Sequence, residues 1–152
     1  AENPNLISLE QLVEKGDLPR TAYQGYLERW ESYKKENERR NDEYVEFGFL
    51  WEHKLGFERK EGYEQAALRQ AYRGFIDRAN KRRKQLFDRF CRDNRKWLDN
   101  YAVFMALKEK YGFSKKWNQW EKKHRSREEG YDENLDKESV KFYKYVQFVF
   151  NL

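Results

Sequence analysis

The sequence predicts an all-α fold, and three observations support this prediction. Apolar and aromatic residues recur along most of the chain at the i, i+3, i+4 spacing of amphipathic helices. No segment reads as a strong strand, and only Pro4 and Pro19 interrupt the 152 residues. Aromatic residues make up 18% of the chain, far more than disordered segments carry, although 39% of the residues are charged. We therefore expect a single helical domain over residues 1–152, with about five to six helices and long charged surfaces.

The first two helices are predicted near the N-terminus. In the segment SLEQLVEKG, Ser8 and Gln11 form a capping box, and Gly16 stands where a left-handed residue ends a helix. A break over residues 17–19 follows. A second, amphipathic helix is expected over residues 21–40, where aromatic residues face away from a charged surface.

Further helical patterns fill the middle of the chain. Asn41 or Asp42 can cap the segment EYVEFGFLWEHKLGFER, which we expect Gly62 to interrupt. Its apolar stripe consists of Phe47, Leu50, Trp51 and Leu55. The helical pattern of residues 68–79 resumes over residues 86–91 after a basic run, which allows either one long helix or two.

Two strongly apolar helices are predicted in the last third of the chain. The segment WLDNYAVFMALKEKYG, residues 97–112, has few polar positions and ends at Gly112, which implies burial on several sides. An irregular stretch over residues 113–134 follows. DKESVKFYKYVQFVFNL then starts at an Asp136 cap and is apolar nearly all round. It ends at Leu152 without a stop signal, so we expect the chain to be part of something larger.

Composition bears on compartment and partners. The 32 basic and 27 acidic residues leave a net charge of +5, and because both signs are interspersed this is weak evidence for a nucleic-acid partner. The single cysteine, Cys91, allows no disulfide framework, and the first twelve residues lack the features of a secretory signal. No stretch approaches the roughly 18 apolar residues that span a bilayer. We expect a cytoplasmic protein without membrane contact.

No catalytic residue, metal site or cofactor is predicted. His53 and His124 lie far apart, and no cysteine or histidine stands at metal-ligand spacing. No serine or cysteine lies in a Gly-flanked turn, and no Gly-rich loop would hold a phosphate. The carboxylates of residues 128–133 fall in the irregular stretch, where we interpret them as solvated surface charge.

The basic run KRRK, Lys81 to Lys84, is the candidate for nucleic-acid contact, with Arg78 one turn earlier. Because the neighbouring aromatic residues keep to the apolar face, we favour a solvated charged face instead. A stand-alone basic helical module that binds nucleic acid or a protein partner stays as the alternative function. Salt-dependent retention on a polyanion would favour that alternative.

Three tryptophans are candidates for sugar contact, because flat aromatic rings stack on the apolar faces of sugars as well as filling cores. They are Trp51, Trp117 and Trp120. Packing in a core or interface is the favoured interpretation of each. Lys54 follows Trp51 by three residues, so on one helix face the two could flank a ligand together or simply pack.

Several motifs resemble one family. WLDNYAVFMALKEKYG followed by WNQWEKKHRSR resembles the 4-α-glucanotransferases of glycoside hydrolase family 77, the amylomaltases or disproportionating enzymes, which read close to WLDDYALFMALKE, then W..W and a basic R.R. NPNLISLEQL is similar to the family's NPLLISLEDL, and VEFGFLWEHK to its VDY..V...K helix. FYKYVQFVFNL resembles the helix that leads back toward the barrel. The resemblance covers nearly all of the chain.

The resemblance implies that the chain is the mainly helical insertion of a (β/α)8-barrel enzyme, and that the barrel itself lies outside it. Such enzymes transfer α-1,4-glucan segments between maltooligosaccharide or starch-derived acceptors by a retaining double displacement. They use an Asp nucleophile, a Glu acid/base and a further Asp, and no position here matches them. The chain is thus expected to shape the substrate cleft without being catalytic on its own.

The resemblance also implies a glucan contact and a docking surface. Trp51 stands where family members can present an aromatic residue toward an accessory glucan groove, and Phe47 replaces the family's tyrosine. Phe47, Trp51 and Lys54 are the predicted glucan-binding residues. The helices over residues 97–111 and 136–152 are expected to bury one side here and to offer the other to the missing barrel, so that the isolated chain self-associates.

Overall fold

The structure is a computed structural model that describes residues 6–40, 42–113 and 136–151. Within these ranges it contains seven α-helices and no strand, which confirms the predicted all-α class. The chain divides into two compact units, the N-terminal unit (residues 3–80) and the C-terminal unit (residues 81–151). The single domain over the whole chain stays a prediction. None of the described helices is both long and apolar enough to cross a membrane.

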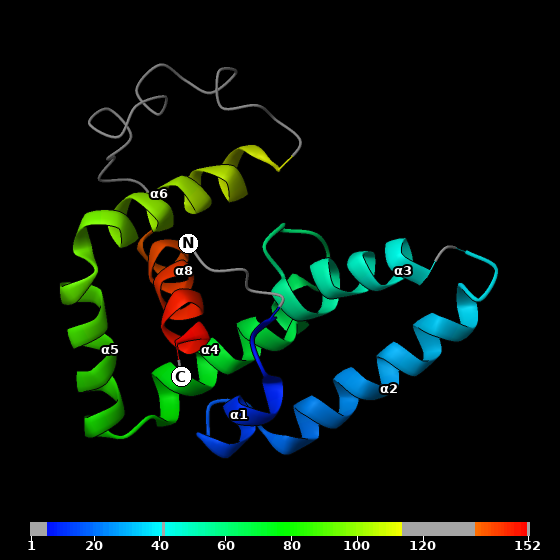
Figure 1. The fold of residues 1–152 in the computed structure, drawn as a ribbon, viewed down its shortest axis with the longest axis horizontal. Coiled ribbons are helices and arrows are strands. Elements are labelled where there is room, and N and C mark those ends of the chain that lie inside the picture. The colour runs from blue at the N-terminus through cyan, green and yellow to red at the C-terminus, as the bar shows by residue number, and fades with distance from the viewer. Residues whose placement is uncertain (1–5, 41, 114–135, 152) are drawn as a thin grey trace. The chain divides into compact units, whose positions relative to one another are not determined.

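The helices of each unit follow the chain order (Figure 1). The N-terminal unit contains α1 (Leu9–Glu14), α2 (Arg20–Glu36), α3 (Asp42–Phe49), the π-helix η2 (Leu50–Leu55), the 3-10 helix η3 (Tyr63–Gln65) and α4 (Ala67–Arg78). The C-terminal unit contains α5 (Lys81–Asp93), α6 (Arg95–Tyr111) and α8 (Lys137–Phe150).

The predicted start of α1 is confirmed, and the end of α2 is corrected. The Ser8 side chain accepts a hydrogen bond from the Gln11 backbone N–H at 3.3 Å, and Gly16 follows the helix with a φ of 89°. α2 stops at Glu36, four residues before the predicted end. There the Asn37 side-chain amide donates to the Tyr33 carbonyl at 2.8 Å, so a local side-chain bond satisfies the last turn.

An aromatic cluster joins α2 to α3 in the N-terminal unit, and Figure 1 shows these two helices as neighbouring arms of a hairpin. Phe49, which is almost fully buried, lies at its centre. Its ring centroid is 5.2 Å from that of Tyr26, 4.9 Å from that of Trp30 and 5.4 Å from that of Tyr33. Rings at these separations pack favourably beyond the area they bury, so this cluster is the main contact between the two helices.

The helix that begins at α3 ends earlier than predicted, at Gly56 rather than Gly62. The α-helix widens into the π-helix η2 after Phe49, and the Gly56 N–H closes it by donating to the Trp51 carbonyl at 3.1 Å. Gly56 has a left-handed φ of 59°, and a Cβ there would lie 2.5 Å from the Cβ of Ala66. Backbone conformation and space both require glycine at this position.

The pattern after Gly62 forms two helices, which settles the choice that the sequence left open. Ala79 has extended backbone angles (φ −61°, ψ 139°), so α4 ends there and α5 starts after it. In the C-terminal unit, α5 contributes Phe87 and Phe90, whose rings lie 5.3 Å and 5.7 Å from that of Phe148 on α8. These contacts fix α5 against α8.

The predicted start of α8 at Asp136 is confirmed. The expectation that one apolar side of this helix is left uncovered is wrong. The Asp136 carboxylate accepts from the backbone N–H groups of Glu138 and Ser139 at 3.0 Å and 3.4 Å, which confirms the cap. α8 lies in the angle between α5 and α6 (orange to red in Figure 1) and contacts both. Because it is packed from more than one side, none of its large apolar residues is exposed.

The other strongly apolar helix, α6, does keep an uncovered side. Trp97 and Phe104 are 37% and 44% exposed, whereas Leu98, Ala102 and Leu107 are buried. Gly112 follows the helix with a φ of 90°, at the predicted stop. Small and branched residues thus face inward, and two aromatic rings face outward.

Candidate functional site

Phe47 and Trp51 form a pair of parallel aromatic rings across the junction of α3 and η2. Trp51 follows Phe47 by four positions, and their ring centroids lie 6.4 Å apart with planes inclined by only 14°. Phe47 is 58% exposed and Trp51 is half-buried. The predicted apolar stripe therefore does not face the core as a whole, because Phe47 turns outward while Leu55 is buried. We call the Phe47 and Trp51 rings the aromatic platform.

The chain after Gly56 braces the aromatic platform. Its left-handed turn brings Phe57 edge-on to Trp51, with ring centroids 5.8 Å apart and planes inclined by 78°. Phe57 is buried, so the indole is supported by a ring that belongs to the core. The Trp51 indole N–H donates to the Glu58 carboxylate (Oε2) at 3.2 Å. Packing and a hydrogen bond together hold the indole in one orientation.

Lys54 does not join the aromatic platform. It is only 7% exposed, and burial lowers its pKa to about 8. The wider π-turn holds more residues than an α-turn, so positions 51 and 54 no longer share a face as they would in an α-helix. The structure thus brings together two of the three predicted glucan-binding residues and places the third inside the N-terminal unit.

His53 lies within the aromatic cluster between α2 and α3. Its ring centroid is 4.7 Å from that of Phe49 and 6.2 Å from that of Tyr33, and burial lowers its pKa. Among the described residues, no three His, Cys, Asp or Glu side chains gather as metal ligands would. The other sequence candidates, His124, Trp117, Trp120 and the carboxylates of residues 128–133, lie outside the described residues.

A buried carboxylate that the sequence analysis missed links α6 to α8. Glu109 accepts hydrogen bonds from the hydroxyls of Ser139 and Tyr143, the latter at 3.1 Å, and all three residues are buried. A carboxylate already held by two protein hydroxyls stabilises the contact between the helices. Glu109 stands between Lys108 and Lys110 in the sequence, so no local signal distinguished it from surface charge.

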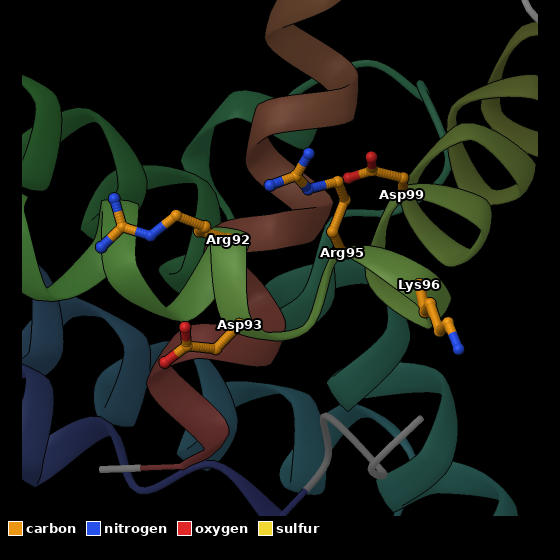
Figure 2. Close-up of a pocket in the computed structure, with 5 residues that line it drawn as sticks. All are labelled: Arg92, Asp93, Arg95, Lys96 and Asp99. Carbon is orange, nitrogen blue, oxygen red and sulfur yellow. The ribbon is translucent and has the colours of Figure 1, made fainter.

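A shallow depression lies where α5 meets α6, lined by Arg92, Asp93, Arg95, Lys96 and Asp99. Figure 2 shows that the side chains of Arg92 and Lys96 point in opposite directions, so the cations do not converge on one point. Asp99 is paired with Lys144 at 3.0 Å. A mixed, divergent set of exposed charges is typical of a solvated surface and does not form an anion site.

The basic run at the start of α5 is also largely exposed. Lys81, Arg82 and Lys84 are exposed, whereas the Arg83 guanidinium lies over the Phe148 ring, 5.3 Å from its centroid. The residue with the most packing in this run therefore contacts the protein's own core. This arrangement agrees with the interpretation of the run as a charged surface.

Comparison with known proteins gives one consistent result. A family model described as 4-alpha-glucanotransferase matches residues 1–152. The chain is 32% identical to a 4-alpha-glucanotransferase of Clostridium butyricum, over 99% of this chain and 26% of that protein. It is 29% identical to one of Thermus thermophilus, over 99% of this chain and 25% of that protein. The chain thus spans about a quarter of the length of these curated relatives. No solved structure gives a significant match.

Proposed function

The chain belongs to the 4-alpha-glucanotransferase family, and from this membership we propose that it is the helical domain of an enzyme that transfers α-1,4-glucan segments. The acceptors would be maltooligosaccharides or starch-derived glucans, and the reaction a retaining double displacement. Relatives that carry the name 4-alpha-glucanotransferase and extend well beyond the matched quarter support this proposal. The catalytic carboxylates would then lie in the remainder of the enzyme, and this chain would shape the cleft.

The aromatic platform is the part of this chain that would contact glucan. The observation that carries this proposal is the pair of parallel, braced rings, of which Phe47 is largely exposed. The carbon-bound hydrogens of a glucose ring form a flat apolar face, which a similarly flat aromatic surface can cover. Because the indole is already fixed by Phe57 and Glu58, little conformational entropy is lost when a sugar binds. Lys54 could touch the sugar only if its side chain turned outward.

Calorimetric titration of the chain with maltoheptaose tests the proposal, with β-linked cellohexaose as the comparison sugar. We expect maltoheptaose to bind and Trp51→Ala to weaken binding about tenfold, because removing the indole removes most of the apolar contact. Phe47→Ala should weaken it less, since the second ring lies at the edge of the platform. Trp97→Ala, which removes an exposed tryptophan from α6, is the matched control and should leave the affinity unchanged.

Two results would count against this function. Equal affinity of wild type and Trp51→Ala for maltoheptaose would place any glucan contact elsewhere. Absence of binding to wild type, or equal binding of both sugars, would remove the basis for a specific α-1,4-glucan site. Quenching of tryptophan fluorescence by maltoheptaose gives an independent readout, and it should be lost in Trp51→Phe.

A further inference from the structure

Glu58 has more hydrogen-bonding capacity than the aromatic platform uses. Its Oε2 atom accepts from the Trp51 indole N–H at 3.2 Å and lies 3.4 Å from the Lys60 ammonium. Both contacts involve the same oxygen. Within the described part of the chain, no hydrogen bond or ion pair engages Oε1, and the side chain is 31% exposed. The carboxylate thus holds the indole with one oxygen and keeps the other for a further donor.

The position of Glu58 is fixed by the residues around it. The Gly56 carbonyl accepts from the Arg69 side chain (Nε) at 2.9 Å in the interior, which anchors the turn to α4. Phe57 is buried, so the next residue is directed toward the edge of the Trp51 ring. A carboxylate held at the edge of a flat ring stands where the hydroxyl groups of a stacked sugar project.

Lys60 supplies the complementary donor beside this carboxylate. Its side chain is 61% exposed, and an exposed ion pair at 3.4 Å is weak enough to rearrange when a ligand arrives. Each internal glucose unit of an α-1,4-glucan carries adjacent free hydroxyls at C2 and C3. A hydroxyl can donate to one group while its neighbour accepts from another. One acceptor and one donor side by side therefore match this pair of hydroxyls.

We propose that Glu58 and Lys60 form the polar edge of the glucan site: Glu58 Oε1 accepts from one hydroxyl of the stacked glucose unit, and Lys60 donates to its neighbour. This inference rests on the proposed glucan contact at Trp51 and adds the groups that bond the sugar hydroxyls. Stacking alone accepts many flat sugar faces. A site built to bond hydroxyls discriminates against ligands that leave its polar groups unpaired.

The experiment must separate a direct contact from a role in holding the indole. Trp51→Phe makes this possible, because phenylalanine keeps an aromatic ring but has no N–H for Glu58 to bind. We expect Glu58→Ala to weaken maltoheptaose binding about three- to tenfold both in wild type and in the Trp51→Phe background, as for the loss of one typical hydrogen bond at a partly exposed site. Lys60→Ala should weaken it up to about threefold. Glu61→Ala, an exposed glutamate in the same loop, should have no effect.

The outcomes distinguish this inference from the proposed function. If Glu58→Ala weakens binding only where Trp51 is present, Glu58 merely positions the indole and the proposed polar edge is wrong. The inference is also overturned if Trp51→Ala abolishes binding while Glu58→Ala changes nothing. If Trp51→Ala leaves binding intact, the proposed glucan contact at Trp51 is wrong, and the inference that rests on it is wrong as well. Near-UV circular dichroism and the urea midpoint of each variant identify any loss that comes from unfolding.

Discussion

Lys54 carries its amino group into the interior of the N-terminal unit, where burial lowers its pKa from the usual 10.5 to about 8. In the unfolded chain the amine is solvated and keeps its ordinary pKa. Between pH 8 and 10.5 the unfolded state therefore binds more protons than the folded state, so this group makes the protein more stable as pH rises. Below about pH 8 both states are protonated, and the contribution no longer changes with pH.

Lys54→Met should remove this pH dependence. We expect the variant to be at least as stable as wild type at pH 7, by up to about 3 kcal/mol, since it no longer buries an ammonium group. The gain should shrink as pH approaches 10. Urea unfolding at pH 7, 8, 9 and 10 measures the difference, with the exposed Lys15→Met as control. A gain that stays constant over this range would show that Lys54 is solvated.

Gly56 decides where the helix ends and where the aromatic platform is braced. It requires a left-handed φ, and a side chain there would also meet Ala66. Gly62 in the same loop has a φ of 79° but open space around its Cα, so it shares only the first requirement. Substituting each glycine by alanine therefore distinguishes the cost of backbone strain alone, at Gly62, from the cost of strain plus steric overlap, at Gly56.

Gly56→Ala should lower the free energy of unfolding by more than about 2 kcal/mol, and Gly62→Ala by about 1 kcal/mol. The larger loss follows because Ala66 must shift in addition to the backbone strain. Gly56→Ala should also displace Phe57 and Glu58, and so change the near-UV circular dichroism of Trp51. Equal losses in the two variants would mean that the contact with Ala66 relaxes freely.

At the scale of elements, features that depend on neighbouring residues could be predicted from the sequence. Features that depend on the tertiary structure could not. The caps at Ser8 and Asp136 follow from residue type and adjacent backbone, so the sequence predicts them correctly. The π-helix after Phe49 has no comparable signal in the local sequence pattern.

The same distinction applies to the candidate site. Trp51 and Phe47 were identifiable by residue type and family resemblance, because they lie only four positions apart in the sequence. Glu58 was not, since it reaches the indole only through the turn at Gly56. The burial of Lys54 was missed for the same reason as the π-helix.

For the molecule as a whole, the uncovered side of α6 is the feature that calls for a partner. Trp97 and Phe104 lie seven residues apart, which is about two helical turns, and both are exposed. Lys108 lies over the Phe104 ring and Tyr101 lies beside Trp97, yet more than a third of each residue stays exposed. Since the chain spans about a quarter of the length of its relatives, we propose that this side docks onto the remainder of the parent enzyme.

The isolated chain should therefore self-associate weakly through α6. We expect dynamic light scattering to show a hydrodynamic radius that grows with protein concentration, and Trp97→Ser with Phe104→Ser to abolish the growth, because the substitutions remove the apolar area that association buries. Leu27→Ser, which removes an exposed leucine from α2, is the matched control and should leave the growth unchanged. A radius independent of concentration in wild type would contradict the prediction. Growth that survives the α6 substitutions but not Leu27→Ser would move the contact to the N-terminal unit.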